Sequence, residues 1–283
     1  MEQDLRLLKA RAAAKTIVAT VIALVALVVT VYPAIWMHIT AVRTNRDLFR
    51  RPWGLPDQIH WENFATAFER SPIPLYFMNS IIVSAASVLI ILLLAALAAY
   101  PFARLSFRGR DALFYMVVSG LMIPPHVALI PLMVLLSKLQ LLGTRFALIL
   151  PNVAFGLPFA VLLLRSFFLT VPRDLEDAAR LDGCTRAGVF WHVMFPLARP
   201  TLAVVATFSF VGTWNEFLFA LTFIQERALK TLPIGLMDFV GEVTTDWVLI
   251  SAGLVIATLP VLIVYIVFQK QIIQSMMGGA LRG

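Results

Sequence analysis

The chain has 283 residues, of which 60% are hydrophobic and 14% charged, and its mean hydropathy is +0.87. This composition excludes an ordinary soluble domain and predicts an integral membrane protein. The net charge of +7 does not indicate a nucleic-acid binder, because the sequence has no basic patch with interleaved aromatic residues.

Six apolar runs are long enough to cross a bilayer core of about 30 Å, which takes roughly 20 helical residues. The runs are residues 17–39, 78–103, 112–136, 146–169, 201–224 and 247–269. Inside lipid, helices satisfy the polar groups of the backbone. The sequence therefore predicts an all-α membrane protein with six transmembrane helices in one domain, residues 17–269.

The first run follows a basic leader, residues 1–16, which contains four Lys or Arg residues. No small-residue cleavage site ends the run, so we expect a retained span and not a cleaved signal peptide. With the leader inside the cell, the inside loops carry more Lys and Arg than the outside loops, as cytoplasmic loops usually do. This bias predicts that the N-terminus and the tail, residues 270–283, are both cytoplasmic.

The first outside loop, residues 40–77, is long and contains four prolines, Trp53, Trp61 and charges of both signs. Residues 61–68 are long enough for two helical turns. We expect this loop to form a folded extracytoplasmic cap.

The third and fourth predicted spans are interrupted by proline, which removes a helical hydrogen bond. The residues are Pro124, Pro125, Pro131, Pro151 and Pro158. Such breaks are tolerated where backbone lines a cavity or meets a neighbouring helix. They are compatible with hinges of a transporter and equally with kinked packing.

The longest polar stretch on the predicted cytoplasmic side is residues 170–200. Asp174 is expected to cap a helix from Leu175 to Asp182, because its first turn is acidic and carboxylates favour that helix end. Gly183 is expected to end this helix.

A second short helix is predicted directly after that glycine. Thr185 is expected to cap it and Pro196 to end it after Val193. The pattern is therefore helix, glycine, helix.

On the first of these helices, Leu175, Ala178 and Ala179 have the spacing of one helix face. Their small side chains predict a shallow apolar surface that another protein can approach closely. A helix lying on lipid headgroups is the alternative, but such helices usually carry basic residues, and this first turn is acidic.

The loop resembles the EAA motif of permease subunits of bacterial ABC importers. That motif reads Glu-Ala-Ala, three residues, Gly, nine residues, Ile, one residue, Leu-Pro. The positions that match its spacing are Asp177, Ala178, Ala179, Gly183, Val193, Phe195 and Pro196. Asp, Val and Phe stand here in place of Glu, Ile and Leu.

The resemblance extends over nearly the whole chain, to the G-type permease subunit of maltose-type carbohydrate importers. The further matching segments are residues 78–80, 98–104, 107–110, 122–124, 130–132, 214–217, 231–236 and 279–283. The resemblance implies a type I ABC importer transmembrane domain in a bacterial or archaeal cytoplasmic membrane. It also implies a heterodimer with a second, homologous permease, two ATP-binding subunits that hold ATP and Mg, an extracytoplasmic solute-binding protein, and a di- or oligosaccharide as substrate.

The resemblance implies contact with the ATP-binding subunits through the EAA loop. The candidate residues are Leu175, Glu176, Asp177, Ala178, Ala179, Asp182, Gly183 and Pro196. The tail residues Gly279, Arg282 and Gly283 are candidates for a second contact, with an ordinary frayed terminus as the alternative. The chain lacks a Gly-x-x-x-x-Gly-Lys-Ser/Thr phosphate loop, so we expect no enzymatic activity and no bound cofactor in this subunit.

Polar and aromatic residues within the spans are candidates for a solute path or gate. They are Asn79, Asn152, Phe155, Trp214, Asn215 and Glu216. Glu216 is the main one, because an ionisable residue within the membrane is a functional hypothesis by default. A purely structural polar cluster is the competing interpretation, and in maltose-type systems the solute contacts chiefly the other permease.

Three other functions are weighed against this one. A secondary transporter needs several buried ionisable groups, and a membrane enzyme needs a cluster of His, Asp or Glu at one depth, whereas the four histidines are dispersed. The closest alternative is an ABC permease for glycerol-3-phosphate, an amino acid or another polar solute. The single cysteine, Cys184, permits no disulfide within the chain.

Overall fold

The computed structural model describes residues 2–241 and 244–280, with side chains described in residues 15–241 and 244–273. Within these ranges the chain forms helices and loops, with one isolated bridge between Val240 and Thr245 and no strand. The prediction of an all-α fold is therefore confirmed.

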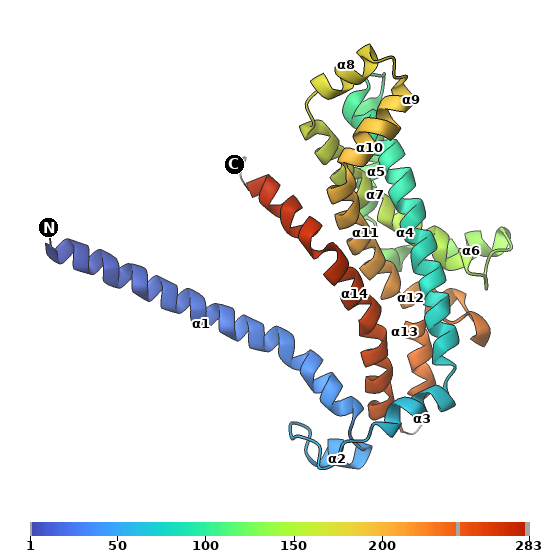
Figure 1. Cartoon of the computed structure of the whole chain (residues 1–283). Coiled ribbons are helices and arrows are strands. Elements are labelled where there is room, and N and C mark those ends of the chain that lie inside the picture. Colours follow the sequence, from blue (N-terminus) through green and yellow to red (C-terminus); the bar gives the residue numbers. More distant parts are fainter. Residues whose placement is uncertain (1, 242–243, 281–283) are drawn as a thin grey trace. The chain divides into compact units, whose positions relative to one another are not determined.

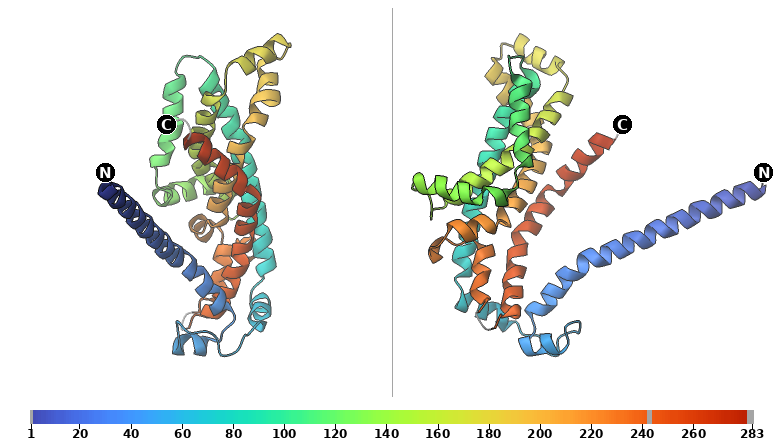
Figure 2. Two further views of the ribbon diagram at one scale, coloured as in Figure 1. Left: turned by 60° about the vertical axis from the view of Figure 1, so that its left-hand side comes forward. Right: turned by 180° about the vertical axis from the view of Figure 1, so that it is seen from behind.

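The chain divides into two compact units, residues 1–70 with 239–256 and residues 71–238 with 257–283. Figures 1 and 2 show the ribbon of both from three directions. The second unit contains every residue of the predicted loop and all the candidate path residues, so the site is described within that unit.

In the part of the chain that the structure describes, four helices are long and apolar enough to cross a membrane. They are α1 (Glu2–Ala41), α4 (Ile73–Arg104), α7 (Phe146–Thr170) and α14 (Trp247–Ala280). They correspond to the predicted first, second, fourth and sixth spans. Two bent helix pairs raise the number of candidate spans among the described residues to six if each pair counts as one.

The third predicted span is not a single helix. Instead, α5 (Arg110–Ser119) and a short 3-10 turn, η1 (Gly120–Met122), are followed by α6 (Pro125–Lys138), at an angle of 94°. Pro124 is extended (φ −66°, ψ 132°) and Pro125 begins α6. The break follows because a residue that precedes proline is disfavoured in helical conformation.

The fifth predicted span, residues 201–224, is not one continuous helix either. The chain forms α11 (Arg199–Trp214), a short break, and then α12 (Leu218–Phe223). The second bent pair lies before this break, where the helical segment Arg186–Leu197 meets α11 at 71°.

The first unit contains the folded loop that follows α1. Thr44 caps α2 (Asn45–Arg50) by accepting a hydrogen bond from the amide of Asp47, and the predicted short helix is α3 (Glu62–Arg70). The fully buried Arg43 pairs with Asp47 at 2.9 Å and donates to the carbonyl oxygen of Arg51 at 2.7 Å. A buried guanidinium satisfied in this way holds the loop in one conformation.

In the second unit, α4 packs against α7 and α11 along its length (Figures 1 and 2). A stripe of small and branched residues on α4 is buried in this packing: Val83, Ile91, Ala95, Ala96, Ala99 and Ala103. From Ile91 to Ala103 the residues recur mostly every three or four positions, as on one helix face, and the alanines let neighbouring backbones approach closely.

Candidate functional site

The loop after α7 begins with α8 (Asp174–Leu181), which starts one residue earlier than expected. Its cap position is Arg173, which makes no side-chain capping hydrogen bond, so the prediction of Asp174 as the cap was wrong. Asp174 still lies in the first turn with the other carboxylates, where negative charge favours the helix.

Gly183 ends α8 as the sequence predicts. It adopts φ +87°, a left-handed conformation that glycine takes without the clash of a Cβ atom. The amide of Gly183 donates to the carbonyl oxygen of Arg180, and the amide of Cys184 donates to that of Ala179, both at 3.0 Å. These bonds satisfy the final carbonyl groups of the helix.

The second predicted helix is longer than expected. Thr185 caps α9 (Arg186–Val189) by accepting from the amide of Gly188 at 3.1 Å, as predicted. The chain then continues through a π-helical turn, η2 (Phe190–Met194), and α10 (Phe195–Leu197). Pro196 does not end the helix, because it stands in the first turn of α10, where its missing N–H is tolerated.

Only part of the predicted apolar face of α8 is exposed. Leu175 is 44% exposed and Ala178 is exposed, whereas Ala179 is buried in the core of the unit. Leu181, which the sequence prediction omitted, is 90% exposed at the end of the helix. The free surface of α8 therefore contains Leu175, Ala178 and Leu181. The exposed charged side chains beside them are Asp174, Asp177, Arg180 and Asp182.

Glu176 points to the interior of its own chain. Its carboxylate lies 2.8 Å from Nε of Arg104, the last residue of α4, and both side chains are only 5% exposed. The hydroxyl of Tyr100 donates to the other carboxylate oxygen at 3.2 Å. The Arg104 guanidinium also donates to the carbonyl oxygen of Val171.

The contact between Arg104 and Glu176 is a buried ion pair by distance, although its Nε–H is not aligned for a hydrogen bond to the carboxylate oxygen. Arg180 lies 3.8 Å from the same carboxylate, on the exposed side of α8. Glu176 is thus buried against Arg104 and Tyr100 and is not part of the free surface of α8. Arg104 and Tyr100 are functional candidates that the sequence prediction missed, although both lie in the family-like segment 98–104.

Three of the candidate path residues line one cavity of about 670 Å³ in the second unit: Asn152, Phe155 and Glu216. The lining also includes the rings of Phe159, Phe208, Phe217 and Phe219. Asn152 is nearly buried, and its amide nitrogen has no hydrogen-bond partner within the chain. The cavity is therefore mostly aromatic with a few polar groups, the usual make-up of a site for a small organic molecule.

Both carboxylate oxygens of Glu216 accept hydrogen bonds from backbone amides at the start of α12. Oε1 accepts from Phe219 at 2.6 Å and Oε2 from Ala220 at 3.0 Å. The carboxylate therefore caps the first turn of α12 from the residue before the N-cap position, Phe217, and it also lies at the wall of the cavity.

Asn79 and Trp214 do not line the cavity. Asn79 is buried, donates to the carbonyl oxygens of Ala228 and Lys230, and accepts from Arg145 at 2.9 Å. Trp214 is buried and donates to the carbonyl oxygen of Ala257 at 2.9 Å. Both hold neighbouring segments together.

The remaining sequence candidates lie elsewhere. Asn215 is exposed in the break after α11. Gly279 belongs to the last part of α14, and Arg282 and Gly283 lie outside the described residues. No structural role is assigned to these tail residues.

An ionic cluster joins the start of α4 to η4 (Leu236–Phe239). Asp238 accepts from the hydroxyl of Tyr76 at 2.8 Å and from the ammonium of Lys230 at 2.9 Å. Ser71 and Arg227 contact the same carboxylate at 3.1 and 3.3 Å. Desolvation alone would raise the pKa of Asp238, but the donors around it, Lys230 and Tyr76 foremost, lower that pKa below its ordinary value.

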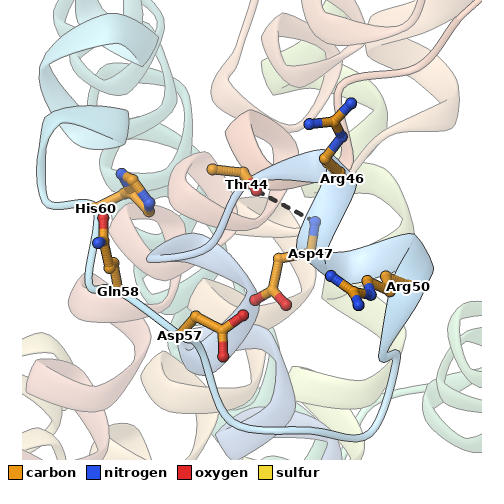
Figure 3. Close-up of a pocket in the computed structure, with 7 residues that line it drawn as sticks. All are labelled: Thr44, Arg46, Asp47, Arg50, Asp57, Gln58 and His60. Atoms are coloured by element: carbon orange, nitrogen blue, oxygen red, sulfur yellow. Dashed lines mark hydrogen bonds between the residues drawn. The ribbon is translucent and has the colours of Figure 1, made fainter.

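A small polar cleft of about 180 Å³ lies in the first unit, between α2 and the loop that follows it (Figure 3). It is lined by Thr44, Arg46, Asp47, Arg50, Asp57, Gln58 and His60. Charges of both signs line it, which gives no preference for an anion or a cation. Among the residues that the structure describes, no group of three or more His, Cys, Asp or Glu is placed to hold a metal ion.

Comparison with known proteins decides the family. Residues 91–278 match the family of binding-protein-dependent transport system inner membrane components. The chain belongs to this family. It is an inner-membrane component with several apolar helices, and its relatives are permease subunits of ABC transporters, which are non-catalytic transmembrane components.

The curated relatives cover most of the chain. A protein of Bacillus subtilis (strain 168), named as a probable ABC transporter permease protein, is 39% identical over 91% of this chain and 85% of its own length. The sulfoquinovosyl glycerol transport system permease of Agrobacterium fabrum is 37% identical, covering 89% of each chain. The diacetylchitobiose uptake system permease NgcG of Streptomyces coelicolor is 36% identical, covering 90% of this chain and 85% of its own.

The fold of this family is also found in a solved structure. A chain of a bacterial ABC transporter involved in the import of the acidic polysaccharide alginate superimposes with a TM-score of 0.77, at 22% identity. The match covers 90% of this chain and 95% of that one. The all-helical fold is thus that of an ABC importer permease.

Proposed function

We propose that this chain is one permease subunit of an ATP-driven importer that takes up a glycoside, with a di- or oligosaccharide as the expected substrate. The relatives are named for sulfoquinovosyl glycerol, diacetylchitobiose, arabinooligosaccharides and the melibiose, raffinose and stachyose group, all of which contain a sugar ring. The related alginate transporter was solved with a periplasmic protein that binds an alginate pentasaccharide. These names support a sugar delivered by an extracytoplasmic binding protein.

In this proposal, the loop of residues 170–200 faces the cytoplasm and contacts ATP-binding subunits, which hold ATP and Mg and carry out hydrolysis. Both termini are then cytoplasmic and residues 40–77 extracytoplasmic. A second, homologous permease completes the translocation path. This chain contributes transmission of movement and half of the path, in the cytoplasmic membrane of a bacterium or archaeon.

The observation that carries the proposal is the exposed surface of α8. An almost fully exposed leucine, Leu181, stands beside three carboxylates on a helix whose opposite side is fixed to the rest of the chain by Glu176. Arg180 is also exposed on this helix and lies 3.6 Å from Asp177, so the exposed leucine is surrounded by charges of both signs. An exposed apolar residue with a charged rim is the usual make-up of a protein contact.

The cavity lined by Asn152, Phe155 and Glu216 is the proposed contribution of this chain to the path. Aromatic rings offer stacking faces to a sugar ring, and the Asn152 amide offers hydrogen bonds. Asn79 and Trp214 are assigned instead to holding helices in place.

The test is co-purification of the ATP-binding subunits with the tagged chain, co-expressed with its partners. Leu181→Asp is expected to reduce the ATPase recovered by at least tenfold, because a charge enters the apolar contact. The matched control is Leu55→Asp, at a leucine that is 72% exposed in the first unit. Equal recovery with both variants would remove α8 from the contact.

The orientation has its own test. Cys184 is the only cysteine of the chain, so a membrane-impermeant thiol reagent reports on one position. We expect labelling in inverted vesicles and not in sealed cells, and labelling of sealed cells would reverse the proposed topology. The substrate is then identified by the sugars that, with the cognate binding protein, stimulate ATP hydrolysis.

A further inference from the structure

The single helix α4 is held at both ends by segments that are distant in the sequence. At its last turns, Arg104 and Tyr100 hold Glu176 of α8. At its first turns, Ser80 accepts a hydrogen bond from the amide of Leu232 at 2.8 Å, and Tyr76 donates to Asp238. In Figure 1, α8 lies beyond one end of α4 and α13 (Leu232–Gly235) lies along the other.

The body of α4 is suited to carry a displacement from one end to the other. It has 32 residues, about 48 Å at 1.5 Å per residue, and contains no glycine. Its one internal proline after the first turn, Pro101, lies in the last turn, next to Arg104. The buried stripe between the two ends packs on α7 and α11, which limits bending.

We propose that Arg104 and Glu176 are positioning residues that transmit movement of α8 to α4, and that α4 carries this movement to residues 224–238. The inference rests on the proposed function, which supplies an ATP-driven partner at α8 and a solute-binding protein on the opposite side of the membrane. It assigns to Glu176 a role inside the chain, in place of a contact with the ATPase.

The ion pair suits this role because both of its members are buried. Loss of one partner leaves an uncompensated charge in a poorly solvated place, so α8 must shift or the remaining group must find water. Arg180 cannot replace Arg104, since it belongs to α8 itself and so cannot connect that helix to α4. Arg104 also holds Val171, so the end of α7 and the start of the loop move together with it.

The first turns of α4, at the end opposite to Arg104, contact residues 224–238 through neutral as well as charged side chains. Asn79 donates to the carbonyl oxygens of Ala228 and Lys230 at 2.8 and 3.0 Å, which fixes the backbone of the segment directly. Ser80 fixes the amide of Leu232 in the same way. A displacement of α4 along its axis therefore moves this segment and not only a side chain.

The experiment uses the complete transporter in proteoliposomes, with its partner permease, ATPase subunits and binding protein. Glu176→Gln keeps the shape of the side chain and removes its charge. We expect basal ATP hydrolysis within twofold of wild type, but at least a fivefold fall in its stimulation by sugar-loaded binding protein and in sugar transported per ATP. The matched control, Asp111→Asn, removes a mostly exposed carboxylate at the start of α5, outside α8, and is expected to change neither ratio by more than twofold.

A second measurement separates positioning from general loss of structure. A nitroxide attached to Cys184 reports the mobility of the turn after α8. Glu176→Gln is expected to increase the mobility of this nitroxide. Ser80→Ala, at the other end of α4, is expected to lower the stimulation of ATP hydrolysis by the binding protein but to leave the nitroxide mobility unchanged. If Glu176→Gln fails to assemble, Tyr100→Phe is the substitute variant, because it removes a single hydrogen bond. We expect it to lower the coupling ratio, meaning the sugar transported per ATP hydrolysed, about twofold.

Wild-type coupling ratios in Glu176→Gln, or in Tyr100→Phe where that variant is used, would overturn the inference. So would a Ser80→Ala variant with full stimulation. Failure of the proposed function looks different: the wild-type chain itself would then show no stimulation by any binding protein and no dependence on Leu181.

Discussion

Oε1 of Glu216 accepts the backbone amide of Phe219 at 2.6 Å, so a carboxylate that the sequence places in a membrane span serves as the cap of α12. Its other oxygen accepts the amide of Ala220. Asn215 and Glu216 interrupt the apolar sequence after Trp214, and the two bonds begin α12 directly after this break. Glu216 therefore has a structural role at the start of α12 in addition to the path role proposed above.

We expect different replacements of Glu216 to lower the stability of the protein to different degrees. Glu216→Ala leaves two amides without their acceptor and is expected to lower the free energy of unfolding by about 1–3 kcal/mol. Glu216→Gln retains one carbonyl acceptor and is expected to lose less. Thermal unfolding of the detergent-solubilised protein measures both. Equal stability of wild type and Glu216→Ala would show that the carboxylate is not needed as a cap.

Gly235 lies against the Tyr76 ring, so that a Cβ atom there would overlap the ring. Gly235→Ala is therefore expected to displace Tyr76 from Asp238 and to destabilise the protein by about 1–3 kcal/mol. Gly212→Ala is the matched control for stability, because a Cβ atom at Gly212 meets nothing within 4 Å. The comparison uses thermal unfolding, and similar midpoints for the two variants would contradict the close contact.

Sequence reasoning succeeded where the determining interactions are local. Run length located four long helices, and the preferences of glycine and threonine located the turn at Gly183 and the cap at Thr185. These features depend on a few consecutive residues. A resemblance carried by the spacing of such residues was accordingly sufficient to identify the family.

Sequence reasoning could not predict the environment of side chains whose contacts come from distant parts of the chain. Glu176 belongs to an acidic first turn that would be solvated on its own, and only the position of Arg104 at the end of another helix draws it inward. Asn79 was a candidate path residue because it is polar within a span, but the carbonyl oxygen of Ala228 and the guanidinium of Arg145 occupy it. Hydropathy cannot detect such pairs, or the breaks within continuous apolar runs.

The cluster around Asp238 predicts a dependence on pH. Because the folded protein lowers the pKa of this carboxyl group, its contribution to stability is present above the ordinary carboxyl pKa and is lost as the pH falls through the lower, folded value. We expect residues 224–238 to lose protection from amide hydrogen exchange over that acidic range. Asp238→Asn is expected to abolish this dependence, while Glu69→Gln, at an exposed carboxylate of α3, is expected to keep it.

The turn at Gly183 offers a test of the proposed contact with the ATP-binding subunits, because a substitution there leaves the exposed residues of α8 unchanged. A Cβ atom at this position meets nothing within 4 Å, so Gly183→Ala adds no clash, and its cost is the left-handed backbone conformation alone, about 1 kcal/mol. Gly183→Asn is the matched variant, because asparagine adopts that conformation more readily than alanine does. We expect the coupling ratio to decrease from wild type to asparagine to alanine, with Leu181 exposed in all three. If alanine and asparagine were equally well coupled, the orientation of α8 would not depend on this turn, and the ion pair to Arg104 would be sufficient to hold it.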